Sequence, residues 1–74
     1  MAIEKIDALG LKCPQPVLLL AVKAREMKKG DILEILGDCR NFEKDVRNWA
    51  QRMNKVILSV NSNDTDKLNI KIQF

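Results

Sequence analysis

The sequence predicts an α/β (α+β) two-layer sandwich of order βαβαββ, with two helices on one face of a four-stranded mixed sheet. Short segments alternate apolar and polar residues as strands do, and two longer segments carry apolar residues at helical spacing. The last strand candidate has only one apolar face, so both helices are expected on that face. The chain has 74 residues, which predicts a single domain over residues 1–74.

The first half of the chain is predicted to form a strand, a helix and a second strand. Residues 3–8 are predicted as a strand with Ile6 and Ala8 on one face and Lys5 and Asp7 on the other, and Gly10 marks the turn that follows. Residues 14–27 are predicted as a helix, because proline is tolerated in a first helical turn and Gly30 can end the segment. Residues 31–37 are almost wholly apolar, which is typical of a central strand.

The second half is predicted to contain a helix and a hairpin. The polar loop 38–41 can cap a helix over residues 42–53. Strands are predicted over residues 55–61 and 67–74, joined by turn-forming residues 62–66. The apolar face of the second helix is predicted to comprise Phe42, Val46, Trp49, Ala50 and Met53. In the last strand, Leu68, Ile70, Ile72 and Phe74 are expected inward, and Lys67, Asn69, Lys71 and Gln73 outward.

Composition excludes several classes of site. The chain has 13 Lys and Arg against 10 Asp and Glu, and this net charge of +3 fits a protein that meets an acidic protein surface better than one that binds nucleic acid. It has no His, which excludes Cys–His and Ser–His nucleophilic pairs, and two Cys alone cannot build a structural zinc site. No metal or organic cofactor is therefore expected.

The sequence shows no pattern of a targeting or membrane segment. Residues 1–7 carry alternating charge, and the longest apolar run, residues 17–22, is too short to span a bilayer. We therefore expect a cytoplasmic protein without a membrane partner. Its two cysteines are expected to be reduced thiols in that compartment.

Cys13 is the strongest candidate for a functional residue. It lies between the Gly10 turn and the predicted helix, and Lys12 precedes it. A helix N-terminus carries partial positive charge and unpaired N–H groups, and both favour a thiolate over a thiol. The position therefore predicts nucleophilic sulfur chemistry at Cys13 rather than core packing.

The residues after Cys13 restrict its surroundings. Pro14 and Pro16 stiffen the first helical turn and remove two N–H donors from it. Gln15 and Val17 keep their N–H groups, and one of these is predicted to face the sulfur of Cys13.

Residues 7–17, with Cys13-Pro14-Gln15-Pro16 at their centre, resemble the signature of the TusA/SirA/YedF sulfur-carrier family. The family pattern is a Cys-Pro-x-Pro motif that follows a Gly-Leu-x turn and opens the first helix. The likeness covers the whole chain in length and element order. It implies the βαβαββ fold, with Cys13 as the residue that accepts sulfane sulfur as a persulfide and passes it on. The supporting motif residues are Gly10, Lys12, Pro14, Gln15 and Pro16.

The resemblance also implies partners. The sulfur donor would be a cysteine desulfurase, which has its own pyridoxal phosphate, or a rhodanese-type protein, and the acceptor would be a downstream protein. Family members serve tRNA thiolation, sulfur oxidation, and molybdenum-cofactor or selenium metabolism. Gln15 departs from TusA, which carries an acid at this position. The loss of that negative charge favours a Cys13 anion slightly.

Cys39 follows the second predicted strand as Cys13 follows the first. Parallel strands place their carboxyl ends at one edge of a sheet, so both cysteine loops are expected there. Two interpretations of Cys39 stay open: a resolving thiol or second sulfur stop near Cys13, and an incidental loop cysteine.

Two other functions also stay open. A dithiol redox protein would need Cys13 and Cys39 with Cα atoms within about 7 Å. A small RNA-binding or regulatory module is less favoured, because aromatic residues and strong positive charge are lacking. The chain is expected to be a monomer. Basic residues on or beside the first helix either dock an acidic partner or form a solvated face. These residues are Lys12, Lys23, Arg25, Lys28 and Lys29.

Overall fold

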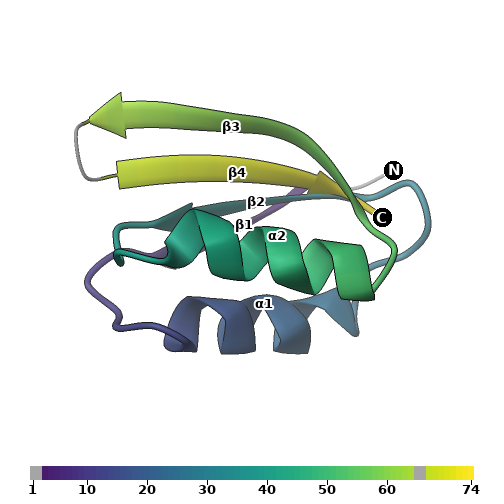
Figure 1. Cartoon of the computed structure of the whole chain (residues 1–74). Helices are drawn as coiled ribbons and strands as arrows, with labels where there is room; N and C mark the ends of the chain where they lie inside the picture. Colours follow the sequence, from purple (N-terminus) through teal and green to yellow (C-terminus); the bar gives the residue numbers. More distant parts are fainter. Residues whose placement is uncertain (1–2, 65–66) are drawn as a thin grey trace.

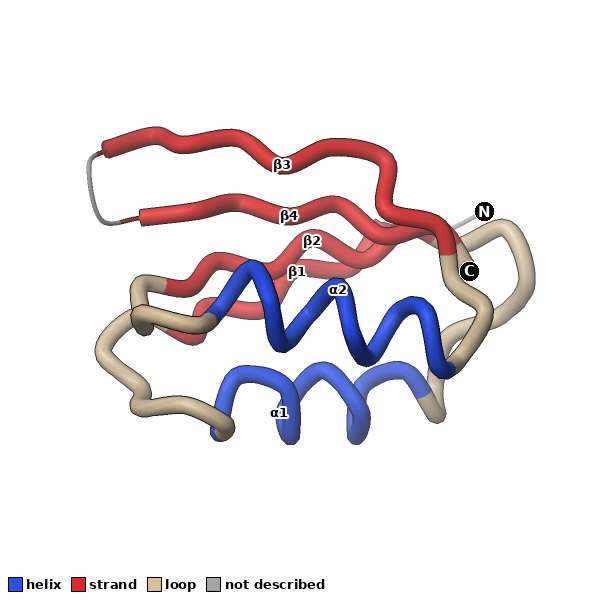
Figure 2. Tube along the Cα trace, viewed as in Figure 1, coloured by secondary structure: helices blue, strands red, loops and turns tan. Residues whose placement is uncertain are grey.

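The computed structural model describes residues 3–64 and 67–74 as a sheet with two helices packed on one of its faces (Figure 1). The elements are β1 (Ile3–Ala8), α1 (Gln15–Ala24), β2 (Ile32–Gly37), α2 (Phe42–Arg52), β3 (Val56–Asp64) and β4 (Lys67–Gln73). Figure 2 shows the strands in one layer and both helices in the other. The predicted two-layer βαβαββ fold is confirmed.

The sheet has the strand order β1-β2-β4-β3. β1 and β2 are parallel, with Ile3 opposite Ile32 and Ala8 opposite Gly37. β4 is antiparallel to both β2 and β3. β2 is therefore central, as its apolar sequence predicts, and the carboxyl ends of β1 and β2 lie at the same edge.

The core lies between the sheet and the helices. β2 contributes Leu33 and Ile35, and α1 contributes Leu20, all fully buried. The other large buried side chains are Pro16, Phe42, Val46, Trp49, Ile70 and Ile72. Within the part of the chain that the structure describes, neither helix is long and apolar enough to cross a membrane.

α1 is shorter than the predicted helix over residues 14–27. After Ala24 the chain tightens, because the N–H groups of Glu26 and Met27 donate to the carbonyl oxygens three residues earlier. Gly30 then takes a φ of 94°, which supports its predicted role at the end of this segment. β2 begins one residue later than predicted, and Oδ2 of the buried Asp31 accepts the N–H of Lys28 at 2.9 Å.

α2 ends one residue before the predicted helix. Met53 is the C-cap and is 52% exposed, so the buried part of the predicted apolar face ends at Ala50. Asn54, at a φ of 57°, turns the chain out of the helix. The expected capping by loop 38–41 is also wrong for Asn41, which makes no side-chain cap hydrogen bond.

β3 is longer than the predicted strand over residues 55–61. Ser62 and Asp64, which were assigned to the turn, pair with Leu68 and Lys67 of β4. β3 lies at the edge of the sheet, where a polar residue such as the exposed Ser62 can keep its backbone pairing while facing water. Residues 65 and 66 of the predicted turn lie outside the described residues.

The burial of two strand residues depends on their neighbours as well as on the side of the sheet that they face. Asn69 lies on the open face opposite Leu36, yet it is only 9% exposed, and its amide donates to Glu34. In β3, Ile57 pairs with Ile72 and packs against the core. The pairing of β3 with β4 shifts in register after Ile57. The side that Ile57 faces therefore does not follow from a strict alternation along the whole strand.

Candidate functional site

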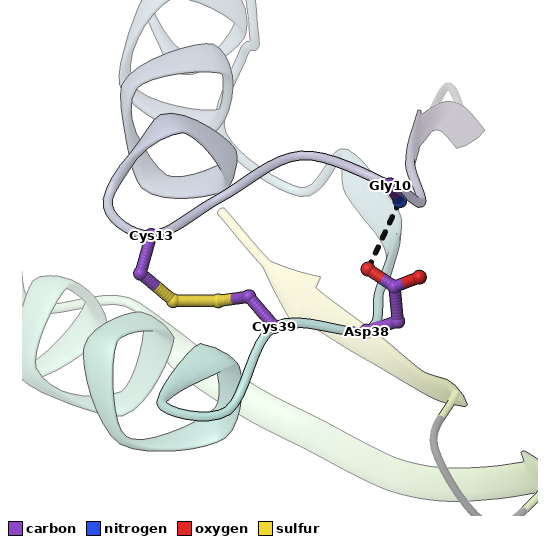
Figure 3. Close-up of a disulfide and its surroundings, with 4 residues drawn as sticks. All are labelled: Gly10, Cys13, Asp38 and Cys39. Carbon is purple, nitrogen blue, oxygen red and sulfur yellow. Dashed lines mark hydrogen bonds between the residues drawn. A yellow bond between two sulfur atoms is a disulfide. The ribbon is translucent and has the colours of Figure 1, made fainter.

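The two cysteines meet at the carboxyl edge of the parallel strand pair (Figure 3). Cys13 follows β1, Cys39 follows β2, and their sulfur atoms form a disulfide with a Cα–Cα distance of 6.0 Å. The expectation of two reduced thiols is therefore wrong for this state of the chain. The physical reason is the parallel β1–β2 pairing, which brings the two loops within disulfide range.

A hydrogen bond also joins the two loops. The N–H of Gly10 donates to Oδ1 of Asp38 at 2.9 Å (Figure 3). Gly10 has a φ of 82°, which side chains rarely tolerate, so glycine suits this turn. The loop that carries Cys13 is thus tied to the residue directly before Cys39.

The first turn of α1 does not offer the predicted N–H group to the sulfur. The N–H of Gln15 donates to the Lys12 carbonyl at 2.8 Å, and that of Val17 to the Pro14 carbonyl at 3.1 Å. The hypothesis that one of them faces Cys13 is wrong here. Both N–H groups close the turn instead, so the helix can support an anion at Cys13 only through its dipole.

The two prolines differ in burial. The Pro16 side chain is fully buried and anchors the start of α1 in the core, whereas Pro14 and Gln15 are exposed. The Cys13–Pro14 peptide bond is cis. Within the motif, Pro16 therefore fixes the start of the helix, while Pro14 and Gln15 form an exposed pair beside the sulfur of Cys13.

A shallow depression of about 450 Å³ lies over the disulfide. Its lining residues are Gly10, Leu11, Lys12, Cys13, Asp38, Cys39, Arg40 and Asn41. Lys12 and Arg40 bring two positive charges against the single negative charge of Asp38. This excess of positive charge favours an anionic sulfur in the depression. Among the described residues, no group of three or more His, Cys, Asp or Glu side chains could hold a metal ion.

One residue of the predicted basic face is already paired. Lys23 Nζ lies 3.2 Å from Glu26 and 3.8 Å from Glu4. The hydrogen bond to Glu26, followed by the charge of Glu4, raises the pKa of Lys23 above its ordinary value. Lys23 therefore offers a partner less unpaired charge than Lys12 or Arg25.

Sequence reasoning missed an apolar surface on α1. Leu18, Leu19 and Val22 are exposed by 58%, 42% and 63%. The signal was the unbroken apolar run 17–22, because a helix covered on one side cannot bury consecutive residues. A groove beside this surface runs between the helices, with Ala21, Trp49 and Lys55 in its lining.

The aromatic rings offer little to an RNA base. Phe42 and Trp49 are buried, and Phe74 is half-buried against Trp49 at 6.1 Å between ring centroids. Base stacking requires an accessible ring face. These are the three aromatic residues of the chain, so the RNA-binding alternative gains no support.

Comparison with known proteins agrees with this geometry. The family model described as "Sulfurtransferase TusA" matches residues 4–73. "Sulfur carrier protein TusA" from Buchnera aphidicola is 35% identical over 60 residues, which are 81% of this chain and 76% of that protein. A "Putative sulfur carrier protein" from Aquifex aeolicus is 32% identical over 59 residues, which are 80% of this chain but only 30% of that longer protein.

Structural comparison finds the same fold in a SirA-like protein from Desulfitobacterium hafniense. The two structures share a TM-score of 0.84 over 95% of each chain, with 24% sequence identity. The family model covers nearly the whole chain, and the Cys13-Pro14-Gln15-Pro16 segment lies within it. The chain therefore belongs to the TusA sulfurtransferase family.

Proposed function

We propose that this chain is a sulfur carrier in which Cys13 accepts sulfane sulfur as a persulfide and passes it to a partner protein. The observation that carries the proposal is the half-buried Cys13 sulfur in an open depression that Lys12 and Arg40 also line. The sulfur-carrier names of the Buchnera and Aquifex relatives add support.

Loading needs only a thiolate at Cys13 and a donor persulfide. The Cys13 thiolate attacks the terminal sulfur of the donor, a new S–S bond forms, and the donor cysteine leaves as a thiolate. Delivery repeats the exchange, with an acceptor thiolate attacking the terminal sulfur on Cys13. The positive charges of Lys12 and Arg40 stabilise the sulfur anion at each stage.

The partners are proteins of sulfur transfer. A cysteine desulfurase carrying pyridoxal phosphate, or a rhodanese-type protein, supplies the sulfur, and tRNA thiolation is one destination that fits the family. The apolar surface of Leu18, Leu19 and Val22 lies on α1, the helix that begins two residues after Cys13. A partner docked there would have its reacting cysteine close to the depression.

The test is loading by a cysteine desulfurase with cysteine, followed by intact mass. The preferred chain is Cys39→Ser, because it has no second thiol that could take the sulfur. It should gain the mass of one sulfur atom, and reduced wild type should gain it at early times. Peptide mapping should place this sulfur on Cys13, and the double variant Cys13→Ser/Cys39→Ser, which has no thiol, should gain none.

A negative result with one donor could reflect an unsuitable donor rather than the absence of a carrier function. The same chains are therefore also treated with a rhodanese-type donor and with inorganic polysulfide. No gain on Cys13 from any of the three donors would refute the carrier function.

One observation favours a second candidate, a dithiol redox protein. The 6.0 Å Cα–Cα distance of the disulfide meets the limit of about 7 Å that this function requires. Such a protein would pass its disulfide to a substrate thiol pair without ever gaining sulfur. Intact mass after incubation of the reduced chain with a persulfidated donor distinguishes the two candidates, because only the sulfur carrier gains the mass of a sulfur atom.

A further inference from the structure

We propose that Cys39 is a resolving nucleophile that expels the sulfur carried on Cys13 as hydrosulfide and closes the disulfide. This inference rests on the proposed persulfide function of Cys13. It gives the chain a second activity besides handing sulfur to a partner, namely the reductive release of sulfide from a persulfide.

The disulfide shows that the Cys39 sulfur can reach Sγ of Cys13, which is the inner sulfur of a Cys13 persulfide. The Cys39 sulfur is bonded directly to the sulfur of Cys13, with the helices and loops of the folded chain in place. This bond is the product expected when Cys39 attacks the inner sulfur of a Cys13 persulfide. Attack on the outer sulfur would instead move the sulfur to Cys39 and leave no bond between the two residues.

The loop around Cys39 is held at both ends, which argues against an incidental cysteine. On one side, Asp38 is hydrogen-bonded to Gly10 of the opposite loop. On the other side, the Phe42 N–H donates to the Cys39 carbonyl at 3.1 Å. The half-buried Cys39 is thus fixed beside the carrier residue, and Arg40 in the same depression favours its thiolate.

The neighbouring glycine strengthens this fixation. A Cβ atom at Gly37 would lie 2.5 Å from two ring carbons of the buried Phe42. The ring therefore packs directly on the backbone at the end of β2, two residues before Cys39. The loop position is set by the core, and it holds the resolving thiol within reach of Cys13.

The reaction balances without an added base or oxidant. The Cys39 thiolate forms a bond to Sγ of Cys13, and the bond from that Sγ to the terminal sulfur breaks. The terminal sulfur leaves as hydrosulfide with the proton of the persulfide, reduced by two electrons, while the two cysteine sulfurs are oxidised to the disulfide. A dithiol reductant of the thioredoxin class then returns the chain to its two thiols.

The experiment is a single loading in the absence of oxygen and of small thiols. A persulfidated donor enzyme, desalted to remove cysteine, is mixed with reduced wild type, Cys39→Ser or Cys13→Ser. Sulfide and intact mass are followed together. Cys39→Ala repeats the test in case serine disturbs this half-buried position.

Wild type should first gain the mass of one sulfur atom and then lose it, ending at the reduced mass less two hydrogens. One hydrosulfide should appear for each disulfide, at least about tenfold faster than any release from Cys39→Ser. Both Cys39 variants should keep the added sulfur. Oxidation by residual air would give the disulfide without sulfide, so the one-to-one ratio identifies resolution.

Two results would overturn the proposal while leaving the carrier function intact. In the first, wild type holds its sulfur as long as Cys39→Ser does; in the second, peptide mapping after alkylation locates the persulfide on Cys39. A failure of the carrier function is a different result, because then Cys39→Ser itself would gain no sulfur.

Discussion

Reduction of the Cys13–Cys39 bond should lower the free energy of unfolding by about 3.5 kcal/mol. The bond joins residues 26 positions apart. Closing a loop of that length removes about 12 cal/mol/K of entropy from the unfolded chain, which gives this energy near about 25 °C. Small domains have total stabilities of about 5–15 kcal/mol, so the reduced chain would lose a large share of its stability.

Urea denaturation with and without a dithiol reductant measures this difference. Trp49 is the only tryptophan and is 7% exposed, so its fluorescence reports the unfolding of the core. With a urea dependence of about 1.5 kcal/mol/M, the midpoint should fall by about 2 M on reduction. Mass spectrometry at each end point establishes the redox state.

The control is Cys39→Ser, whose midpoint should not change with reductant. If wild type moves by less than about 0.5 M although the bond is fully reduced, the reasoning from loop closure is refuted. The two loops would then hold each other through the Asp38–Gly10 hydrogen bond and the core, whatever the state of the cysteines.

Three further predictions follow from other parts of the structure. Gly37→Ala should destabilise the chain by about 1–3 kcal/mol in urea denaturation, because its methyl group would collide with the buried Phe42 ring. Val22→Ser should slow sulfur transfer between proteins but not loading from polysulfide, whereas Ile3→Ser, equally exposed on the opposite face, should change neither. Asp38→Ala should slow disulfide closure in a sulfide-release assay, because the loops lose their hydrogen bond.

Each of these has an outcome that contradicts it. An unchanged midpoint for Gly37→Ala would mean that the Phe42 ring can move aside. Equal effects of Val22→Ser and Ile3→Ser would remove the α1 surface as the docking site. If Asp38→Asn closes the disulfide as slowly as Asp38→Ala does, loss of the hydrogen bond is not the cause, because asparagine retains a side-chain oxygen that can accept it.

The spacing of apolar residues along the chain predicted the sheet layer and the helix layer, because this spacing depends on which side of a strand or helix each residue faces. The apolar face of β4 requires helices on one side only, and the apolar β2 requires neighbours on both edges. Parallel pairing then fixes the place of both cysteine loops. The juxtaposition of Cys13 and Cys39 could therefore be anticipated, but the bond between their sulfurs was not, because the expectation of reduced thiols rested on the compartment.

The remaining details depend on neighbours that a sequence does not show. Ser62 and Asp64 look like turn residues, but β4 supplies backbone partners that keep them in β3. The sequence pattern predicts an exposed Asn69, yet its side chain is buried on the open face of the sheet, where its amide donates a hydrogen bond to Glu34. The N–H groups of the Cys13 turn likewise bond to nearby carbonyl oxygens, which residue type alone does not reveal.

The disulfide should also control when the chain can take up sulfur. Sγ of Cys13 cannot be a nucleophile while it is bonded to Cys39, so the oxidised chain has no thiolate to attack a donor persulfide. Oxidised wild type should gain no sulfur from a desalted donor until a dithiol reductant is added and removed. Cys39→Ser should load without that treatment, since it cannot form the internal bond. If oxidised wild type loads as fast as the reduced chain, the donor persulfide must open the disulfide itself. The bond would then be a substrate of the transfer rather than a block to it.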